Sequence, residues 1–183
     1  MDNTGDRPVF VGVGANLPHP SFASPRDTLQ AALLELDRRG ARVVRCSRWY
    51  RTAPVPASDQ PWFVNVVAEI ATSLSADDLL AMLHEIEDLF GRVRSVPNAA
   101  RLIDLDLLDY RGGISPPGSG RAVLPHPRMA ARAFVLRPLA DLVPRWRHPV
   151  SGASIGDLVK ALPPDQVAEP FGAPGLPFGP GRV

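Results

Sequence analysis

The chain has 183 residues, of which 45% are hydrophobic, and this is enough for one globular domain with a sizeable core. A formal net charge of +1 argues against a broad surface for nucleic acid or anionic membranes, so we expect neither as a partner. The single Cys46 allows no internal disulfide, and neither a signal peptide nor an apolar run of membrane-spanning length is apparent, so the sequence predicts a soluble, cytoplasmic protein.

Hydrophobic periodicity and capping residues predict the order of helices and strands. Ser24 followed by Pro25 favours a helix start, because serine caps the first turn and proline suits the first helical position. Ser75 with an acidic first turn opens a second helix in a similar way. The predicted elements are a strand at 9–14, a helix at 24–40, strands at 43–50 and 62–70, a helix at 75–91, a strand at 101–108 and a further helix through residues 131–139.

This order matches a ferredoxin-like α+β fold, in which a mainly antiparallel sheet carries helices on one face. We assign residues 1–8 to a flexible N-terminus and residues 9–162 to a single domain, which we expect to be a monomer. Residues 163–183 hold six prolines and four glycines in 21 positions. That composition predicts a flexible tail with no part in the core.

The loop and strand between residues 51 and 70 contain a possible binding surface. The loop at 51–61 is rich in proline, and its length is typical of functional loops. In the following strand, Phe63 and Asn65 share one face, where a ring and an amide could stack on a flat heterocycle and hydrogen-bond its edge. On spacing alone, a core position for Phe63 and an edge position for Asn65 is the preferred interpretation.

Two histidines carry weak signals when they are considered singly. His84 lies three residues before Glu87 on a predicted helix, and without further ligands the pair is expected to face solvent rather than bind zinc. His126 lies between Pro125 and Pro127, which restrict its backbone and hold it in position. Taken alone, His126 favours a structural role over a catalytic one.

The strand at 101–108 alternates apolar and acidic residues. Such a period of two sends Asp104 and Asp106 to one face and the intervening leucines to the other. Two neighbouring carboxylates repel each other unless a cation lies between them, and Mg²⁺ binds through one or two carboxylates together with substrate phosphates. An edge strand with two solvated aspartates is an equally good interpretation of this strand by itself.

Arginines around the strand favour the metal-binding interpretation. All basic residues except Lys160 are arginines, whose planar guanidinium groups suit phosphate. Arg92 and Arg94 lie shortly before the strand, and Arg101 begins it. Three guanidiniums close to two carboxylates predict polyphosphate chemistry, which needs cations against the developing charge and metal ions that align the chain.

With these residues identified, the sequence resembles the family of 6-hydroxymethyl-7,8-dihydropterin pyrophosphokinases, which are enzymes of folate biosynthesis. The resemblance runs from about Val9 to Leu162, and its motifs occur in the family's order. These motifs are Tyr50-Arg51-Thr52-x-Pro54, Asp59-Gln60-Pro61-x-Phe63-x-Asn65, Gly91-Arg92-Val93-Arg94, Arg101-x-x-Asp104-Leu105-Asp106-Leu107-Leu108, and Pro125-His126 with Arg132-x-Phe134.

The resemblance implies that the terminal pyrophosphate of ATP is transferred to the hydroxymethyl oxygen of the pterin and that AMP is released. It implies two Mg²⁺ ions per active site, held by Asp104 and Asp106, and a catalytic role for Arg92 and Arg101. The implied contacts to ATP are Arg92, Arg94, Arg101, His126 and Arg132. The implied contacts to the pterin are Thr52, Val55, Phe63, Asn65 and Phe134.

The chain departs from the family pattern at two places. Family members often carry Trp-Gly-Pro where this chain has Asn98-Ala99-Ala100, so the aromatic residue of that loop is missing. Phe63 stands where tyrosine is common, which keeps a stacking ring and loses a hydroxyl.

Two other classes of protein compete with this interpretation. A non-catalytic ferredoxin-like module that binds RNA or protein would need a basic, aromatic sheet face, and the near-neutral charge counts against it. A nucleotidyltransferase would also use paired aspartates. It would release free pyrophosphate, whereas a pyrophosphokinase releases AMP.

Overall fold

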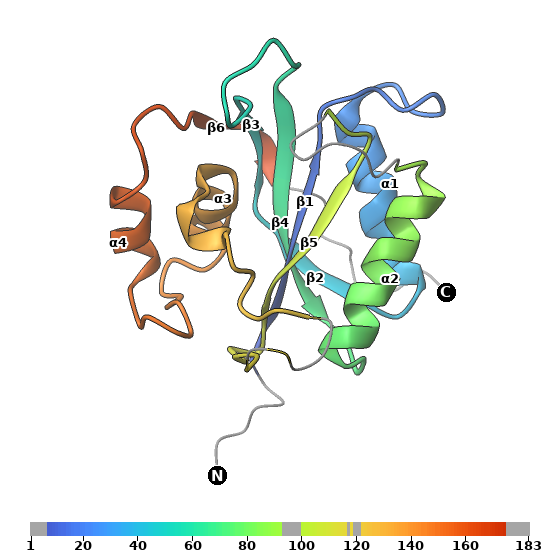
Figure 1. Cartoon of the computed structure of the whole chain (residues 1–183). Helices are drawn as coiled ribbons and strands as arrows, with labels where there is room; N and C mark the ends of the chain where they lie inside the picture. Colours follow the sequence, from blue (N-terminus) through green and yellow to red (C-terminus); the bar gives the residue numbers. More distant parts are fainter. Residues whose placement is uncertain (1–6, 93–99, 117, 119–121, 175–183) are drawn as a thin grey trace.

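The computed structural model describes residues 7–92, 100–116, 118 and 122–174 (Figure 1). These residues form a six-stranded sheet in which every strand pair is antiparallel. The strand order is β5-β1-β4-β3-β6, and β2 also pairs with β4. The strands are β1 (Val9–Ala15), β2 (Arg42–Cys46), β3 (Arg48–Thr52), β4 (Phe63–Ala71), β5 (Asp104–Tyr110) and β6 (Ala168–Pro174). The predicted ferredoxin-like α+β class is therefore confirmed.

Helices lie on both faces of the sheet, with α1 and α2 on one side of it and α3 and α4 on the other (Figure 1). Their bounds are α1 (Pro25–Arg38), α2 (Ala76–Leu89), a 3₁₀ turn at Met129–Ala131, α3 (Ala133–Leu142) and α4 (Ile155–Lys160). The expectation that helices cover only one face is wrong, because the central strands are apolar on both faces. Phe10 and Leu108, for example, pack in the cluster under α3.

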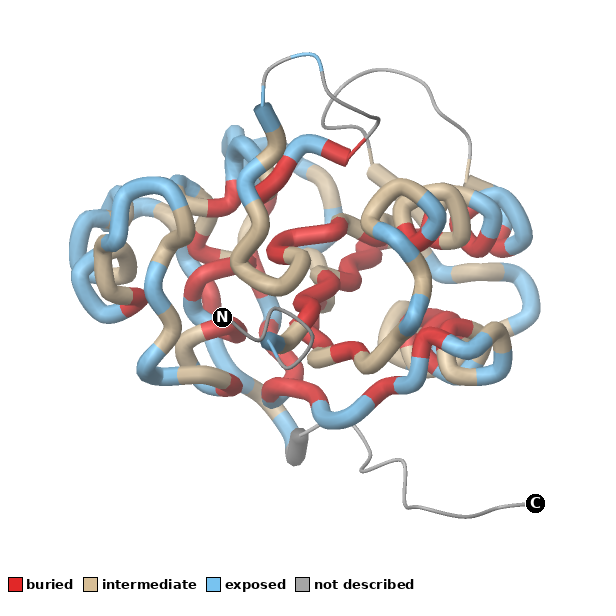
Figure 2. Tube along the Cα trace, turned by 90° about the horizontal axis from the view of Figure 1, so that it is seen from below, coloured by how far each residue is buried: buried red, intermediate tan, exposed pale blue. Residues whose placement is uncertain are grey.

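Burial follows from this layered arrangement. Figure 2 shows buried segments in the middle of the molecule and exposed segments around its outside. In β1, Val11 and Val13 pack with α1 and α2, while Phe10 faces the opposite layer, and all three are buried. No helix among the residues that the structure describes is long and apolar enough to cross a membrane.

Serine caps start three of the helices. Ser24, Ser75 and Ser154 each accept a hydrogen bond from the backbone N–H of the aspartate three residues later. Each serine hydroxyl also donates to the carboxylate of that same aspartate, at 2.6–2.7 Å. Such a cap contributes about 1 kcal/mol. The starts predicted at Ser24 and Ser75 are confirmed.

The strand predicted at 43–50 is split into β2 and β3 at Ser47. The backbone N–H of Ser47 donates to the Val67 carbonyl at 2.9 Å, and its hydroxyl accepts from the Val67 N–H at 3.1 Å. One strand, β4, therefore pairs with both pieces, β2 along its second half and β3 along its first. A hydrophobic pattern cannot show this break, because both pieces bury residues on the same sheet.

The flexible tail predicted from residue 163 is wrong for residues 168–174, which form the edge strand β6 against β3. Ala168 is buried, and the side chain of Gln166 accepts from the Ala133 N–H at 2.8 Å and donates to the Ala131 carbonyl at 3.0 Å. Proline is tolerated in an edge strand, because one side of that strand needs no N–H donors. Residues 175–183 and residues 1–6 lie outside the described residues.

Cys46 is buried at the end of β2, and burial raises the pKa of its thiol to about 12. Relative to an unfolded thiol, a shift of this size lowers the thiolate fraction by about 1,000-fold at neutral pH. We expect a colorimetric thiol reagent at pH 8 to react far more slowly with the native protein than with the protein in denaturant. Equal rates would contradict the burial of this thiol.

The raised pKa of Cys46 also makes the free energy of unfolding depend on pH. The folded-state pKa lies above that of an unfolded thiol, so folding favours the neutral form. This contribution to the free energy of unfolding is complete below about pH 8.5 and is lost as the pH rises toward 12.

Candidate active site

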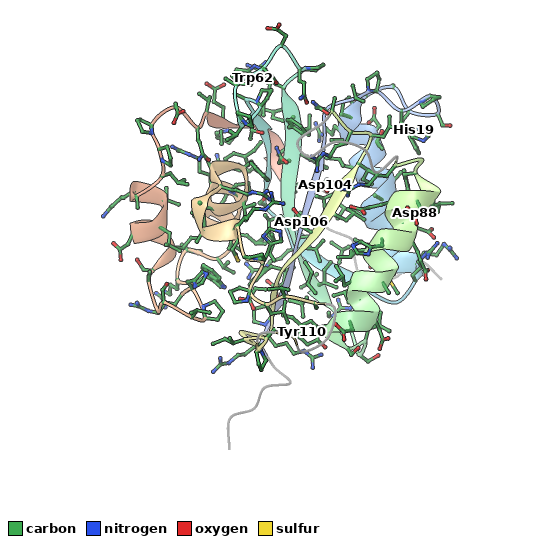
Figure 3. All side chains as sticks on the ribbon, viewed as in Figure 1. His19, Trp62, Asp88, Asp104, Asp106 and Tyr110 are labelled. Atoms are coloured by element: carbon green, nitrogen blue, oxygen red, sulfur yellow. The ribbon has the colours of Figure 1, made fainter. Side chains whose placement is uncertain are left out.

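Asp104 and Asp106 project from β5 near the middle of the molecule, as Figure 3 shows. Ile103, Leu105 and Leu107 are buried on the other side of the strand, at 4% exposure or less, so the predicted two-faced strand is confirmed. Burial raises the pKa of Asp106, and the negative charge of Asp104 raises it further. The two carboxylates therefore repel each other in a partly desolvated place.

Glycines on the neighbouring strand leave room beside the two carboxylates. Gly14 and Gly12 of β1 are the cross-strand partners of Asp104 and Asp106. A Cβ atom at Gly14 would lie 2.5 Å from Oδ1 of Asn65, so only glycine lets that amide approach. A shallow hollow between these glycines, Asn65 and the two aspartates is the result.

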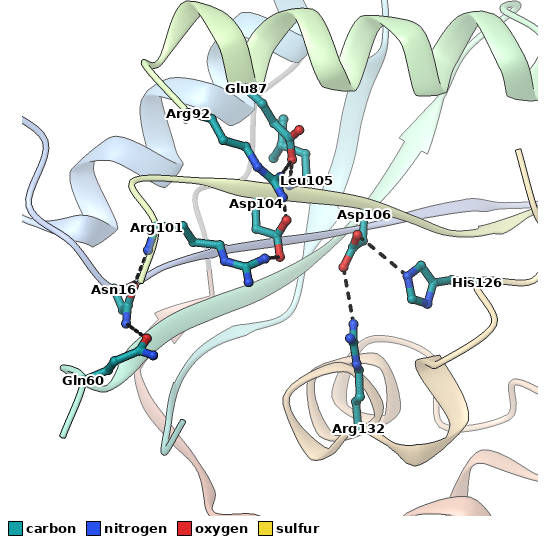
Figure 4. A network of polar contacts seen from close by, with 10 residues as sticks. All are labelled: Asn16, Gln60, Glu87, Arg92, Arg101, Asp104, Leu105, Asp106, His126 and Arg132. Carbon is teal, nitrogen blue, oxygen red and sulfur yellow. Dashed lines mark hydrogen bonds and ion pairs between the residues drawn. The ribbon is translucent and has the colours of Figure 1, made fainter. Parts of the chain in front are cut away.

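Four cationic or imidazole groups converge on the aspartates (Figure 4). Arg92 and Arg101 each place a guanidinium nitrogen 2.6 Å from a different oxygen of Asp104. Arg132 and His126 lie 3.7 and 3.8 Å from Asp106. The structure thus brings together every predicted ATP contact except Arg94, which lies outside the described residues.

The arginines stay charged in this place. Burial opposes the charge of Arg92, yet the carboxylates of Asp104 and Glu87 outweigh it and raise the pKa of Arg92. Burial lowers the pKa of Arg132, and the nearby Arg128 lowers it further. An arginine nevertheless remains protonated at neutral pH in a protein.

His126 is held with a defined orientation. Its Nδ1 accepts a hydrogen bond from the Arg128 backbone N–H at 3.2 Å, so a neutral ring carries its proton on Nε2, the atom that faces Asp106. Burial lowers the pKa of His126; the charge of Asp106 opposes this, and Arg132 lowers the pKa further. Burial thus favours the neutral ring, and His126 lies in the site rather than in a purely structural position.

The donor set suits Mg²⁺. Two carboxylates on one face, with room beside them, match an ion that binds through one or two carboxylates and completes its shell with phosphate and water oxygens. Within the described ranges, no group of three or more His, Cys, Asp and Glu side chains could hold a metal ion. Asp104 and Asp106 are the residues that would hold the ion.

An aromatic pocket adjoins the carboxylates. It is lined by the predicted pterin contacts, together with Arg101, Asp104 and Arg132. Asn65 is 6% exposed, and its side-chain amide donates to the Thr52 hydroxyl at 2.7 Å. Arg132 lies over the ring of Phe134, 5.3 Å from its centroid, and so touches both the pocket and the site. The five predicted contacts brought together here are Thr52, Val55, Phe63, Asn65 and Phe134.

This arrangement corrects the interpretation of Phe63 and Asn65 that spacing alone favoured. Phe63 is only partly buried, and it lines the pocket instead of joining the core. Asn65 is a buried residue of β4, between β1 and β3, not an edge position. Strand periodicity predicts which residues share a face, but not whether another element covers that face or leaves a hollow.

Asn16 is a site residue that the sequence did not reveal. Its side-chain amide donates to the Pro61 carbonyl at 3.0 Å and to Gln60 at 3.3 Å, and its Oδ1 accepts from the Arg101 N–H at 2.8 Å (Figure 4). One buried side chain thus joins the end of β1, the loop after β3 and the approach to β5. In the sequence it is only one of several turn-forming residues, and its contacts are 44 to 85 positions away.

Glu87 is a second residue of the site that the sequence did not reveal. The prediction that Glu87 faces solvent is wrong. It is 1% exposed and contacts both Arg92 and the Leu105 N–H. His84, three residues earlier, lines the same hollow as Asp104 and Asp106. The periodicity of α2 places Glu87 beside its apolar stripe, and that is the only signal that it could be buried.

A ferredoxin-like sheet with paired carboxylates, converging arginines and an adjoining aromatic pocket defines an enzyme that transfers a phosphate-containing group to a flat acceptor. A family model described as 7,8-dihydro-6-hydroxymethylpterin-pyrophosphokinase (HPPK) matches residues 10–144. The chain belongs to this family.

Curated relatives agree with this placement. The chain is 39% identical to the 2-amino-4-hydroxy-6-hydroxymethyldihydropteridine pyrophosphokinase of Synechocystis sp., over 93% of this chain and 83% of the relative. It is 42% identical to the enzyme of the same name from Pseudomonas aeruginosa, over 85% of this chain and 91% of the relative.

Among solved structures, the chain is similar to a Plasmodium falciparum HPPK-DHPS triple mutant, with a TM-score of 0.64 and 12% identity. The match covers 87% of this chain and 46% of that longer chain, and it supports the fold.

As a member of this family, the chain is an enzyme of folate biosynthesis that transfers pyrophosphate from ATP to 6-hydroxymethyl-7,8-dihydropterin. The predicted activity is confirmed. The non-catalytic binding module and the nucleotidyltransferase are set aside.

Proposed function

We propose that the pterin binds in the aromatic pocket, with its ring system between Phe63 and Phe134. Two aromatic side chains from different elements, β4 and α3, line this one pocket, and such rings stack on flat heterocycles. Asn65, Thr52 and the backbone near Val55 would hydrogen-bond the polar edge of the ring. Hydrogen-bonding groups placed at one end of an apolar pocket are what orient a ligand in it.

The pocket meets the carboxylate site at Asp104 and Arg101, and this shared lining is the observation that carries the proposal. A second hollow also borders Asp104, and its lining includes Glu87, Arg92, Asp106 and His126. We propose that it holds the triphosphate of ATP. The acceptor and the donor would then meet at Asp104.

We propose that Asp104 and Asp106 hold two Mg²⁺ ions. Bound there, the ions would neutralise the phosphate oxygens and align the chain for displacement. Burial raises the pKa of Asp106, and repulsion by the charge of Asp104 raises it further. A cation between the two carboxylates would relieve this repulsion.

The side chains around the two carboxylates have separate tasks in this proposal. The hydroxymethyl oxygen would lose its proton to water as it bonds to the β phosphorus, while the bond between the β phosphorus and the oxygen of the α phosphate breaks and negative charge moves onto AMP. Arg92 and Arg101 would stabilise that charge, while Arg132, His126 and Arg94 would bind the triphosphate. Most of the rate enhancement would come from positioning and charge, as in other phosphoryl transfers.

The assignment of Asn65 can be tested with Asn65→Leu, which keeps the volume and removes the amide. We expect KM for the pterin to rise at least about 10-fold, because the polar edge of the ring would lose a partner in a buried pocket. The affinity for a non-hydrolysable ATP analogue with Mg²⁺, measured by calorimetry, should stay the same. Wild-type KM in a folded variant would place the pterin elsewhere.

We further propose that the enzyme acts as a monomer in the cytoplasm. The only cysteine is a buried free thiol, which is compatible with a reducing compartment.

A further inference from the structure

The carboxylate of Glu87 lies in the interior, although it belongs to α2, a helix that covers the sheet. It is 1% exposed, and its Oε1 accepts a hydrogen bond from the Leu105 backbone N–H at 2.7 Å. The same oxygen contacts a guanidinium nitrogen of Arg92 (Figure 4). A buried charge is costly unless it is paired and hydrogen-bonded, and here both conditions hold.

The contact to Leu105 fixes the part of the backbone that carries both aspartates. Leu105 lies between Asp104 and Asp106 on β5, which is at one end of the strand order. An end strand has N–H groups that no neighbouring strand pairs with. Glu87 satisfies one of these groups from the helix, so the peptide between the two carboxylates is held at a set distance from α2.

The contact to Arg92 fixes a side chain of the site. One guanidinium nitrogen of Arg92 contacts both Glu87 and Oδ1 of Asp104, the latter at 2.6 Å. Arg92 thus lies between the helix and the strand, with one carboxylate on each side. If Glu87 lost its charge, Asp104 would be the one of these two carboxylates that still holds Arg92. The guanidinium of Arg92 could then rotate around its contact with Asp104.

We propose that Glu87 is a positioning residue for pyrophosphate transfer: it holds the guanidinium of Arg92 and the Leu105 peptide in the places that the reaction needs. This inference rests on the proposed assignment of Arg92 and Asp104 to the nucleotide site. It adds a residue whose carboxylate oxygen contacts Arg92 and the Leu105 N–H and which acts through Arg92, although it also borders the hollow proposed for the triphosphate.

The first test is Glu87→Gln, which keeps an oxygen acceptor for the Leu105 N–H but removes the charge that holds Arg92. We expect kcat to fall about 10- to 100-fold, the usual loss when a supporting residue behind a site is changed. KM for the pterin should stay within about 2-fold, because the aromatic pocket is separate from this contact. Glu85→Gln, an exposed position on the same helix, is the matched control and should keep the wild-type kcat.

The second test is a double-mutant cycle. If Glu87 acts through Arg92, Glu87→Gln should add almost no loss to an Arg92→Ala enzyme, because residues that work as a unit are strongly non-additive. A purely structural role predicts that the two losses multiply, and that result would overturn the proposal. A folded Glu87→Gln enzyme with the wild-type kcat would overturn it as well.

Melting temperatures separate loss of function from loss of fold. Should Glu87→Gln fail to fold, Glu87→Asp replaces it in both tests, since it keeps the charge and withdraws it by one methylene. Unchanged kcat in that variant would also contradict the inference. Asp104→Ala tests the site assignment itself, which is wrong if this variant stays active. If Asp104→Ala is inactive while Glu87→Gln is fully active, only the proposed role of Glu87 is refuted.

Discussion

Asp104→Ala and Asp106→Ala should each lower kcat at least about 1,000-fold at saturating Mg²⁺, ATP and pterin, because each removes a proposed ligand for a metal ion that neutralises the transferred group. Both variants should stay folded. The side chains lie opposite the buried face of β5, and burial together with the charge of Asp104 disfavours the ionised form of Asp106. Removing either carboxylate therefore leaves the buried face of β5 in place, although Asp104→Ala also removes the ion pairs to Arg92 and Arg101.

The measurement is AMP and pterin diphosphate formed over time, followed by mass spectrometry, with melting temperatures recorded beside it. Asp88→Ala is the matched control, because Asp88 is an exposed aspartate on α2 outside the site. A folded Asp104→Ala or Asp106→Ala enzyme with the wild-type rate would refute the metal assignment.

Arg101→Ala should lower kcat about 100-fold, the scale of losing one group that stabilises charge in the transition state. The affinity for the pterin should change by less than about 3-fold, although Arg101 also lines the aromatic pocket, because stacking and the Asn65 amide remain. In the structure Arg101 lies 2.6 Å from Asp104, so its guanidinium is already beside the proposed meeting point of the two substrates.

Single-turnover rates and pterin affinity, the latter measured by calorimetry, distinguish this role from ordinary binding. Equal losses in rate and in affinity would mean that Arg101 binds the ground state as strongly as the transition state. Arg42→Ala, an exposed arginine on β2, controls for the loss of one positive charge.

Local patterns predicted the elements that hold the site. The alternation around Asp104 and Asp106 predicted a two-faced strand, and the structure buries its apolar side. Ser24 and Ser75 marked helix starts that the structure contains. These features depend on residues within a few positions of one another, where backbone geometry alone decides which side chains share a face.

Long-range contacts decided what local patterns could not. Ser47 breaks a strand because it bonds Val67, twenty residues away, and Gln166 docks the segment before β6 onto residues more than thirty positions earlier. The second layer of helices became necessary only because β1, β4 and β5 bury side chains on both faces. The composition of residues 163–183 predicted a flexible tail. Composition carries no information about the open edge of the sheet at β3, with which residues 168–174 pair.

The sequence by itself determined the class of protein, because motifs between Tyr50 and Phe134 occur in the family's order and each of them is a local pattern. Only the tertiary structure showed that Glu87 and Asn16 belong to the site. Each carries one polar side chain to partners on distant segments, Glu87 to Leu105 and Asn16 to Arg101. Burial of a polar group depends on those partners, and they become neighbours only when the sheet and its helices are packed together.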